Sequence, residues 1–327
     1  MILGMVFVIA EVGINHGGSF ELALKHIHSA KRAGADAVKF QLFKAENLVS
    51  SRQMPESFEF FRRVALNYDE IGLLFSEAQR VGIEFIATPF DLEAVNFLDS
   101  LPVKRFKVAS GDIDNLPLLR SIAEKRKPIL LSTGMSTLED ISLALSEINQ
   151  VYPCDITLLH CVSLYPTPIE EANLLCVRTL KEKFRLKVGY SDHTVGINCA
   201  LTAVALGAEV IEKHFAIDKS VAVPDIACSV DEEELRKLKE LAQEISASLG
   251  SGEKVPSERE AEVREGARRS VYASREIDEG EVLNQDNLVL LRPANGIPAR
   301  HFYAVIGKRA KRKIPSNSPI FWDDIVL

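Results

Sequence analysis

Short apolar runs alternate with longer amphipathic stretches along the chain from Val6 to Phe215. Each run is rich in Val, Ile, Phe and Leu and is too short for a helix, so the pattern predicts strands separated by helices. Eight such repeats over about 210 residues predict an α/β fold that closes into a parallel (β/α)8 TIM barrel. An open doubly wound sheet is the alternative, but it would favour a glycine-rich phosphate loop, and none follows a predicted strand. The predicted strands are Val6–Ala10, Ala37–Leu42, Glu84–Thr88, Phe106–Ser110, Ile129–Ser132, Thr157–Cys161, Lys187–Ser191 and Val210–His214.

The pattern changes after the eighth predicted strand. A long charged helix is expected over Asp231–Leu249, and glycines end it. Short β-prone runs at Ser270–Ala273, Val289–Leu291 and Ile320–Trp322 then alternate with Gly, Pro and Asn turns, which is typical of a small, mostly β domain. We therefore expect a catalytic barrel over residues 1–250, a polar linker over 251–269 and a second domain over 270–327.

Composition limits the partners that the protein can have. The chain has 327 residues, 46% of them hydrophobic, and a formal net charge of −7, which disfavours a nucleic-acid partner but not a small anionic substrate. No apolar run approaches the roughly 20 residues of a membrane span, and the apolar start of the chain is too short for a signal peptide. The five cysteines form no CxxC pair and indicate reduced thiols. These features predict a cytoplasmic protein without a membrane partner.

Polar side chains follow most of the predicted strands, at the end of a barrel where active sites are built. Lys39 and Lys107 stand out because burying an unpaired ammonium is costly, so two of them in one barrel indicate an anion between them. A salt bridge to a neighbouring carboxylate is the alternative explanation for each lysine. The hydroxyls of Thr88, Ser110 and Ser191 complete a cradle for a phosphate or carboxylate. The other strand-end residues are Glu11, Asn15, His16, Gln41, Asp91, Asp112, Ser163, Tyr165, Asp192 and Lys213.

Two histidines end the last two predicted strands. His193 and His214 lie one strand–helix repeat apart, which places both imidazoles at the same end of neighbouring strands. Two neutral imidazoles there can hold one divalent cation. Glu11, near such a cation, is the candidate general acid or base. Asp192 beside His193 has a simpler explanation as a structural carboxylate, and His160 inside an apolar run as a core residue.

These motifs, in this order and over nearly the whole chain, resemble those of the sialic acid synthase family. From about Ser270 the chain resembles the antifreeze-like domain of the same enzymes, and Arg292-Pro293-Ala294-Asn295-Gly296 matches their Arg-Pro-x-Asn-Gly turn. The matching barrel motifs are AEVGINH (Ala10–His16), VKFQ (Val38–Gln41), FKVAS (Phe106–Ser110), STGM (Ser132–Met135), HC (His160–Cys161), YPTP (Tyr165–Pro168), GYSDHT (Gly189–Thr194) and EKHF (Glu212–Phe215).

The resemblance implies an enzyme that condenses phosphoenolpyruvate with an open-chain N-acetylated amino sugar, such as N-acetylmannosamine, to a nine-carbon acid and phosphate. It implies that His193 and His214 hold Mn²⁺, with Co²⁺ and Mg²⁺ as alternatives. It also implies a domain-exchanged homodimer in which Arg292 reaches the substrate of the other subunit. The residues that the resemblance assigns to phosphoenolpyruvate are Lys39, Thr88, Lys107, Ser110 and Ser191, and those that it turns towards the sugar are Glu11, Gln41, Tyr165 and Asp225.

Departures from the family pattern leave the sugar open. Ser163 stands where sialic-forming relatives often carry Asn, Asp112 where many carry Glu, and Ala222–Asp225 replaces a Pro-Gly-Pro-Asp loop. Synthases of legionaminic acid, pseudaminic acid or spore-coat sugars therefore remain alternatives. Another phosphoenolpyruvate-dependent aldolase would need arginines for a sugar phosphate, and none follows a predicted strand. A non-enzymatic binding protein would have no use for the strand-end polar groups.

Overall fold

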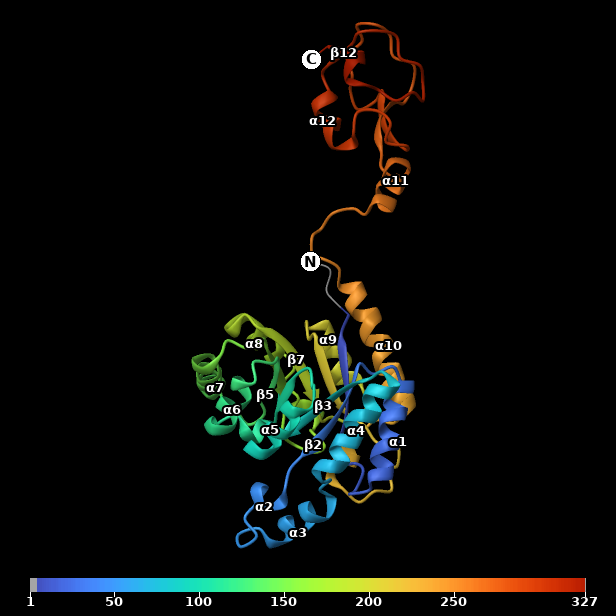
Figure 1. Ribbon diagram of the computed structural model, residues 1–327. Coiled ribbons are helices and arrows are strands. Elements are labelled where there is room, and N and C mark those ends of the chain that lie inside the picture. The colour runs from blue at the N-terminus through green and yellow to red at the C-terminus, as the bar shows by residue number, and fades with distance from the viewer. Residues whose placement is uncertain (1–4, 327) are drawn as a thin grey trace. The chain divides into compact units, whose positions relative to one another are not determined.

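The computed structural model describes residues 5–326 and divides the chain into two compact units, one ending at Ser251 and the other beginning at Gly252. In the first unit eight parallel strands follow the order β3-β2-β1-β8-β7-β6-β5-β4, and β3 also lies beside β4. Helices surround these strands (Figure 1), which confirms the predicted TIM barrel. The strands are β1 (Phe7–Gly13), β2 (Ala37–Leu42), β3 (Glu84–Pro89), β4 (Phe106–Val108), β5 (Ile129–Ser132), β6 (Ile156–Cys161), β7 (Lys187–Asp192) and β8 (Val210–His214).

The helices begin and end at the local signals that the sequence carries. Asn67 caps α4 through a reciprocal pair of hydrogen bonds with Glu70, and Gly82 ends the same helix with a φ of 74°, a conformation that favours glycine. Thr137 caps α7 in the same reciprocal way. The helices of the first unit are α1 (Phe20–Arg32), α2 (Ala45–Leu48), α3 (Pro55–Val64), α4 (Tyr68–Val81), α5 (Leu92–Ser100), α6 (Leu116–Glu124), α7 (Leu138–Val151), α8 (Cys176–Phe184), α9 (Asn198–Ala205) and α10 (Glu232–Leu249).

The long connection after β2 carries α2 and α3 beyond the carboxyl end of the barrel (Figure 1). This excursion has a small aromatic core of its own, in which the Phe43 and Phe61 rings meet edge to face with centroids 5.5 Å apart. Phe90, at the end of β3, packs against Phe43 in the same manner. The excursion is therefore anchored on the strand ends that border the barrel mouth.

The barrel interior is layered because side chains alternate along each strand. One layer of inward-facing residues is apolar and forms a floor across the barrel. Two positions further along each strand, towards its carboxyl end, the inward-facing side chains become polar. Glu11 follows Ile9 on β1, Lys39 follows Ala37 on β2, and Glu212 follows Val210 on β8. A polar layer therefore lies directly above an apolar floor. The six buried residues of that floor are Ile9, Ala37, Ile86, Leu130, Leu159 and Val210.

The second unit has its own core and two short antiparallel ladders. The strand predicted at Ile320–Trp322 is wrong, because Asp324 accepts the backbone N–H of Phe321 and closes a 3-10 turn at Trp322–Asp324. The backbone of Ile320 nevertheless pairs with Val271 and Ile297. The elements are α11 (Glu258–Ala267), β9 (Ser270–Ala273), β10 (Leu288–Leu291), α12 (Phe302–Val305), β11 (Arg309–Ala310) and β12 (Ile325–Val326).

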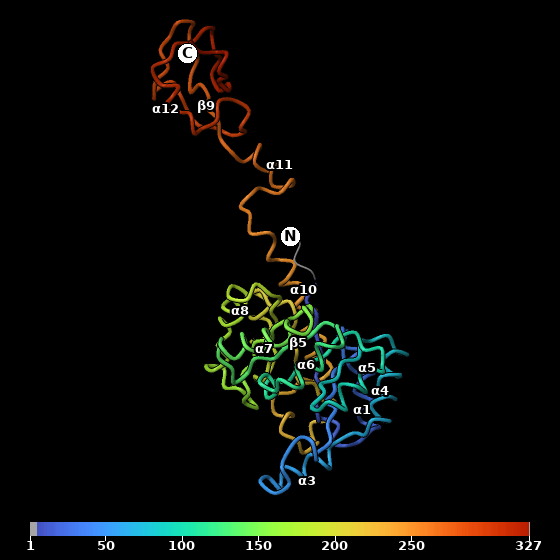
Figure 2. Tube along the Cα trace, turned by 60° about the vertical axis from the view of Figure 1, so that its left-hand side comes forward, coloured from blue at the N-terminus to red at the C-terminus, as the bar shows by residue number. Residues whose placement is uncertain are grey.

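The stretch predicted as a linker contains the helix α11 (Figure 2). Ser257 caps this helix by accepting the backbone N–H of Glu260, and every residue of the helix is exposed. Packing does not hold a helix that is polar all round, and the Ser257 cap satisfies one of the backbone N–H groups at its start. At its end the carbonyl of Glu265 accepts the N–H of Ala294, which ties α11 to the loop that begins at Arg292.

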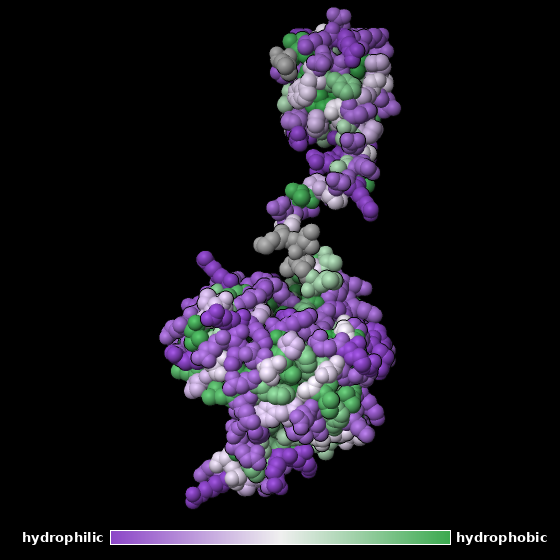
Figure 3. All heavy atoms as spheres, viewed as in Figure 1, coloured by the Kyte–Doolittle hydropathy of each residue, from purple (hydrophilic) through white to green (hydrophobic). Residues whose placement is uncertain are grey.

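Hydrophilic side chains cover most of the face of each unit drawn in Figure 3. Within residues 5–326, no helix combines the length and the apolar character that crossing a membrane requires.

Candidate active site

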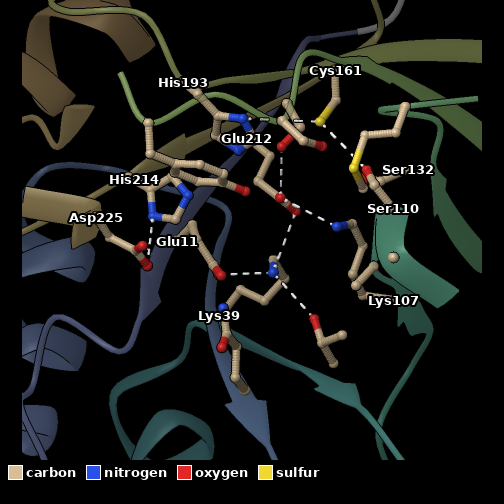
Figure 4. Close-up of a pocket in the computed structure, with 18 of the residues that line it drawn as sticks. Glu11, Lys39, Lys107, Ser110, Ser132, Cys161, His193, Glu212, His214 and Asp225 are labelled. Carbon is tan, nitrogen blue, oxygen red and sulfur yellow. Dashed lines mark hydrogen bonds and ion pairs between the residues drawn. The ribbon is translucent and has the colours of Figure 1, made fainter. Parts of the chain in front are cut away.

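A cavity of about 270 Å³ lies at the carboxyl ends of the barrel strands, and its polar side chains converge from β1, β2, β4, β7 and β8 (Figure 4). The barrel residues that were predicted to bind substrate or metal all line this cavity, whereas the other strand-end candidates do not: Asn15, His16, Asp91, Asp112, Asp192 and Lys213. Arg292, the remaining predicted residue, belongs to the second unit. The predicted residues in the lining are Glu11, Lys39, Gln41, Thr88, Lys107, Ser110, Ser163, Tyr165, Ser191, His193, His214 and Asp225.

Two lysines and two glutamates form a buried charge cluster at the base of the cavity. Lys39 Nζ lies 2.8 Å from Glu11 Oε2 and 3.7 Å from Glu212 Oε2. Lys107 Nζ lies 3.3 Å from Glu212 Oε1, which also accepts a 2.9 Å hydrogen bond from the Ser191 hydroxyl. The structure thus supports the salt-bridge explanation of the two lysines, so their burial alone does not require an anion.

The two glutamates of this cluster have different protonation behaviour. Burial would raise the pKa of Glu212, but Lys107 and Lys39 beside it lower that pKa to about 2. Burial raises the pKa of Glu11 to about 7, against the opposing effect of Lys39 and with the help of the negative charge on Glu212. Glu212 is therefore a permanent anion, whereas Glu11 exchanges a proton near neutral pH.

The sequence prediction overlooked Glu212 and named its neighbour Lys213 instead. The signal was present, because residues two apart on a strand face the same way and Glu212 stands two positions before His214. Lys213 does not line the cavity and bonds to Asp192, away from it. Ser132 and Cys161 were also overlooked, although Ser132 ends β5, Cys161 ends β6 and both side chains line the cavity.

The hydroxyls around the charge cluster differ in their hydrogen bonding. Thr88 accepts a hydrogen bond from Lys39, and Ser110 accepts one from the backbone N–H of Gly134. The Ser132 hydroxyl is buried and has no hydrogen-bond partner among the described residues. A buried hydroxyl in a polar cavity without a partner indicates that a ligand or water completes the site. An added Cβ on Gly134 would lie 2.4 Å from Ser163 Oγ and 2.9 Å from Ser110 Oγ, so these hydroxyls would have to move for any larger residue.

His193 and His214 stand one layer nearer the mouth, with ring centroids 5.2 Å apart. The Nδ1–H of His193 donates to the carbonyl of Val162 at 2.7 Å, a tautomer that leaves the Nε2 lone pair free for a metal. Burial and the nearby His193 lower the pKa of His214 well below its ordinary value, so this imidazole is neutral. The Nδ1 of His214 lies 3.5 Å from Asp225 Oδ2. The two rings fit the donor set of one divalent cation.

The protein groups available to such a cation are few. Within residues 5–326, no group of three or more His, Cys, Asp or Glu side chains is placed to hold a metal ion, so His193 and His214 would be the only such ligands. A cation held by two imidazoles alone keeps positions open for water and substrate. The Tyr165 ring lies against His193, with centroids 4.1 Å apart, and burial raises the pKa of Asp225 to about 6. Both residues border the space beside the two histidines.

The fold and this cavity define a (β/α)8-barrel site built around buried lysine–carboxylate pairs and two imidazoles. Residues 26–254 match the NeuB family and residues 268–326 match the SAF domain. The chain belongs to the NeuB family.

Named relatives align along most of their length. The chain is 39% identical to the N,N'-diacetyllegionaminic acid synthase of Legionella pneumophila over 98% of this chain and 94% of that protein. It is 35% identical to a pseudaminic acid synthase of Campylobacter jejuni over 94% of this chain and 93% of that protein. The crystal structure of a sialic acid synthetase from Leptospira borgpetersenii, in complex with citrate, is 38% identical and superposes with a TM-score of 0.76, covering 80% of this chain and 90% of that one.

Proposed function

We propose that the protein is a sialic-acid-type synthase, which joins phosphoenolpyruvate to the aldehyde of an open-chain N-acetylated amino sugar and releases phosphate. The observation that carries this proposal is the arrangement of two buried lysines below two imidazoles in one barrel mouth. Membership of a family whose named relatives are synthases of legionaminic and pseudaminic acids supports it.

Phosphoenolpyruvate is the ligand for the deeper part of the cavity. Its phosphate and carboxylate are both anionic, and Lys39 and Lys107 supply the two positive charges. The Ser132 and Ser110 hydroxyls lie in the same lining and can donate to these oxygens. Glu11, with a pKa of about 7, takes up a proton when an anion approaches, which removes the nearest negative charge from the site.

The bond changes follow from the chemistry of an enol phosphate. The enol carbon forms a bond to the aldehyde carbon of the sugar, and the carbon bearing the phosphate becomes electron-poor. A water molecule adds to that carbon, and the C–O bond to phosphate breaks in the resulting tetrahedral intermediate. The aldehyde oxygen becomes a hydroxyl by taking one of the two protons that the added water supplies, and the other proton goes to the phosphate. Glu11 is the group positioned to pass the proton between the added water and the departing oxygen. A divalent cation held by His193 and His214 would polarise the sugar aldehyde as a Lewis acid.

The sugar occupies the upper part of the cavity, beside Gln41, Ser163, Tyr165 and Asp225. Ser163 is short, and its hydroxyl lies against Gly134, which leaves more room than an asparagine would at this position. Room at this position favours a bulkier sugar, and the N,N'-diacetyllegionaminic acid synthases among the relatives support a diacetamido sugar as the first candidate.

Arg292 is assigned to the substrate of a partner subunit. Its loop is held in place, because the Tyr272 hydroxyl lies 2.7 Å from Asn295 Oδ1 and 3.1 Å from the Pro293 carbonyl, and the Ser270 hydroxyl donates to the same carbonyl. An exposed guanidinium on a rigid loop can donate to sugar hydroxyls or an amide carbonyl. The proposed assembly is a homodimer in which each second unit covers the barrel mouth of the other subunit.

One assay tests the reaction. Phosphate release from phosphoenolpyruvate is measured with Mn²⁺ and a panel of free amino sugars that includes N-acetylmannosamine and diacetamido hexoses. We expect sugar-dependent phosphate release, fastest with a diacetamido sugar. Release only with phosphorylated sugars would instead support the aldolase alternative. No release with any sugar, from protein shown to bind phosphoenolpyruvate, would overturn the proposed reaction.

A further inference from the structure

A second buried ion pair lies directly behind the two histidines, on the outer side of the barrel wall. Lys213 Nζ donates to Asp192 Oδ2 at 3.0 Å, and both side chains are 0% exposed. Asp192 and Lys213 are paired across β7 and β8, and each immediately precedes one of the histidines, His193 or His214. Neither lines the cavity, so neither contacts a substrate there.

The contacts of Lys213 enclose the backbone of His193. Lys213 bonds to Asp192, the residue before His193, and to the carbonyl of Thr194, the residue after it. Asp192 Oδ1 in turn accepts the backbone N–H and the hydroxyl of Thr194, each at 2.8 Å. Three side chains therefore close a buried ring of hydrogen bonds around one residue, and the lysine that completes it belongs to the strand that carries His214.

Stability alone does not account for this arrangement. A buried ion pair loses its hydration, and well-packed apolar residues of the same volume are often equally stable in its place. The pair does something that apolar residues cannot do, because directional hydrogen bonds fix the backbone on both sides of His193 relative to β8. The imidazole of His193 is itself oriented by the Val162 carbonyl, so backbone and ring are both restrained.

We propose that Lys213 and Asp192 are positioning residues that set the separation and orientation of His193 and His214 for one divalent cation. The inference rests on the proposed function insofar as the two histidines hold a metal. Without Lys213 the end of β7 would be held less firmly, the His193 ring would shift from its place 5.2 Å from His214, and the two imidazoles would be less well placed to hold one cation.

The test measures Co²⁺ binding to the metal-free full-length protein by calorimetry and by the visible absorption of Co²⁺. We expect Lys213→Met to weaken Co²⁺ binding about tenfold or more and to change the spectrum, with Lys213→Arg recovering much of the affinity. The matched control is Lys187→Met, which removes the exposed 3.1 Å pair with Asp155 at the start of β7 and is expected to bind Co²⁺ like the unmodified protein. A folded Lys213→Met protein with unchanged Co²⁺ affinity and spectrum would overturn the proposal.

Two further measurements separate the possible failures. If Lys213→Met does not fold, the double variant Asp192→Asn/Lys213→Met leaves no unpaired charge and keeps an acceptor for Thr194, and the same loss of Co²⁺ affinity is expected. A metal-free crystal structure of whichever variant folds reads the ring positions directly, without any metal. Unchanged histidine rings there refute the positioning role. If the rings are displaced in the variant and the unmodified protein does not bind Co²⁺, the positioning role is supported and only the metal site is refuted.

Discussion

Lys39 Nζ and Glu11 Oε2 form a 2.8 Å ion pair in which each side chain is only 3% exposed. An incoming anion therefore meets a lysine that already has a partner, and binding requires that partner to become neutral or to turn away. The pKa of Glu11, which burial raises to about 7, makes neutralisation accessible at physiological pH. The proposed anion binding at Lys39 would thus be linked to proton uptake at Glu11.

Replacing Lys39 or Lys107 with Met should weaken phosphoenolpyruvate binding by roughly 2–5 kcal/mol, the cost of truncating one partner of a buried charge pair. Apparent affinity at saturating sugar is the measurement. Lys125→Met, which removes a partly exposed contact with Asp99, serves as the control and should bind normally. Loss of sugar affinity alone would mean that the lysines serve the other subsite.

Metal removal should abolish turnover, and so should His193→Ala or His214→Ala without unfolding the barrel. A cation held by two imidazoles loses half of its protein ligands with either substitution. Turnover after exhaustive chelation, with Mn²⁺, Co²⁺ or Mg²⁺ restored in turn, gives the readout together with circular dichroism. Full turnover in excess chelator would contradict the metal site.

Acid should destabilise the first unit through His26. Burial lowers the pKa of His26 to about 4, opposed by its bond to Leu22 and by the nearby Asp218. Because the folded protein holds this proton less tightly than the unfolded chain, stability is complete above about pH 6.5 and falls as the pH drops towards 4. The loss from this histidine amounts to about 3 kcal/mol, and His16, whose pKa is also about 4, acts in the same direction.

Urea unfolding at several pH values measures this loss. The variant His26→Gln should show a shallower decline than the unmodified protein over the same range. His28→Gln, on the same helix, removes the partly exposed pair with Glu77 and keeps His26, so it should keep the decline that His26 causes. Equal slopes in all three proteins would show that His26 does not titrate as described.

Subunit exchange tests the role of Arg292. Inactive His193→Ala and inactive Arg292→Ala proteins are mixed under conditions that exchange subunits. In a mixed dimer one barrel has an intact metal site and an intact arginine from its partner, so activity should return to roughly a quarter of the unmodified level after random pairing. Mixed dimers that mass spectrometry detects but that stay inactive would place Arg292 in its own subunit's site or outside catalysis.

The barrel was predictable because its signal is repeated. Each predicted strand coincides with an observed strand, with ends that differ by a few residues, since alternation and helix caps are local properties of the chain. The Ile320–Trp322 strand failed for the opposite reason. Its conformation depends on the Asp324 carboxylate folding back onto Phe321, and apolar pattern alone does not reveal that contact.

The sequence predicted which residues line the candidate site but not which of them form ion pairs. Strand-end position identified Lys39, Lys107, His193 and His214 without any knowledge of their neighbours. That Lys107 pairs with Glu212, which is 105 residues distant, follows only from closing the barrel and bringing β4 opposite β8. The prediction placed Lys213 correctly at a strand end but did not say which way it faces. Alternation along the strand turns it away from the cavity, because Glu212 and His214 on either side of it face inward.

An apolar floor closes the barrel below the charge cluster, so the cavity opens only towards the carboxyl ends of the strands. The floor residues are Ile9, Ala37, Ile86, Leu130, Leu159 and Val210. A ligand held by the lysines would lie deepest, between this floor and the layer that carries the two histidines. A sugar bound beside the histidines would cover the ligand held by the lysines. In the proposed reaction, phosphoenolpyruvate would therefore bind before the sugar, and it would leave only after the sugar had reacted or departed.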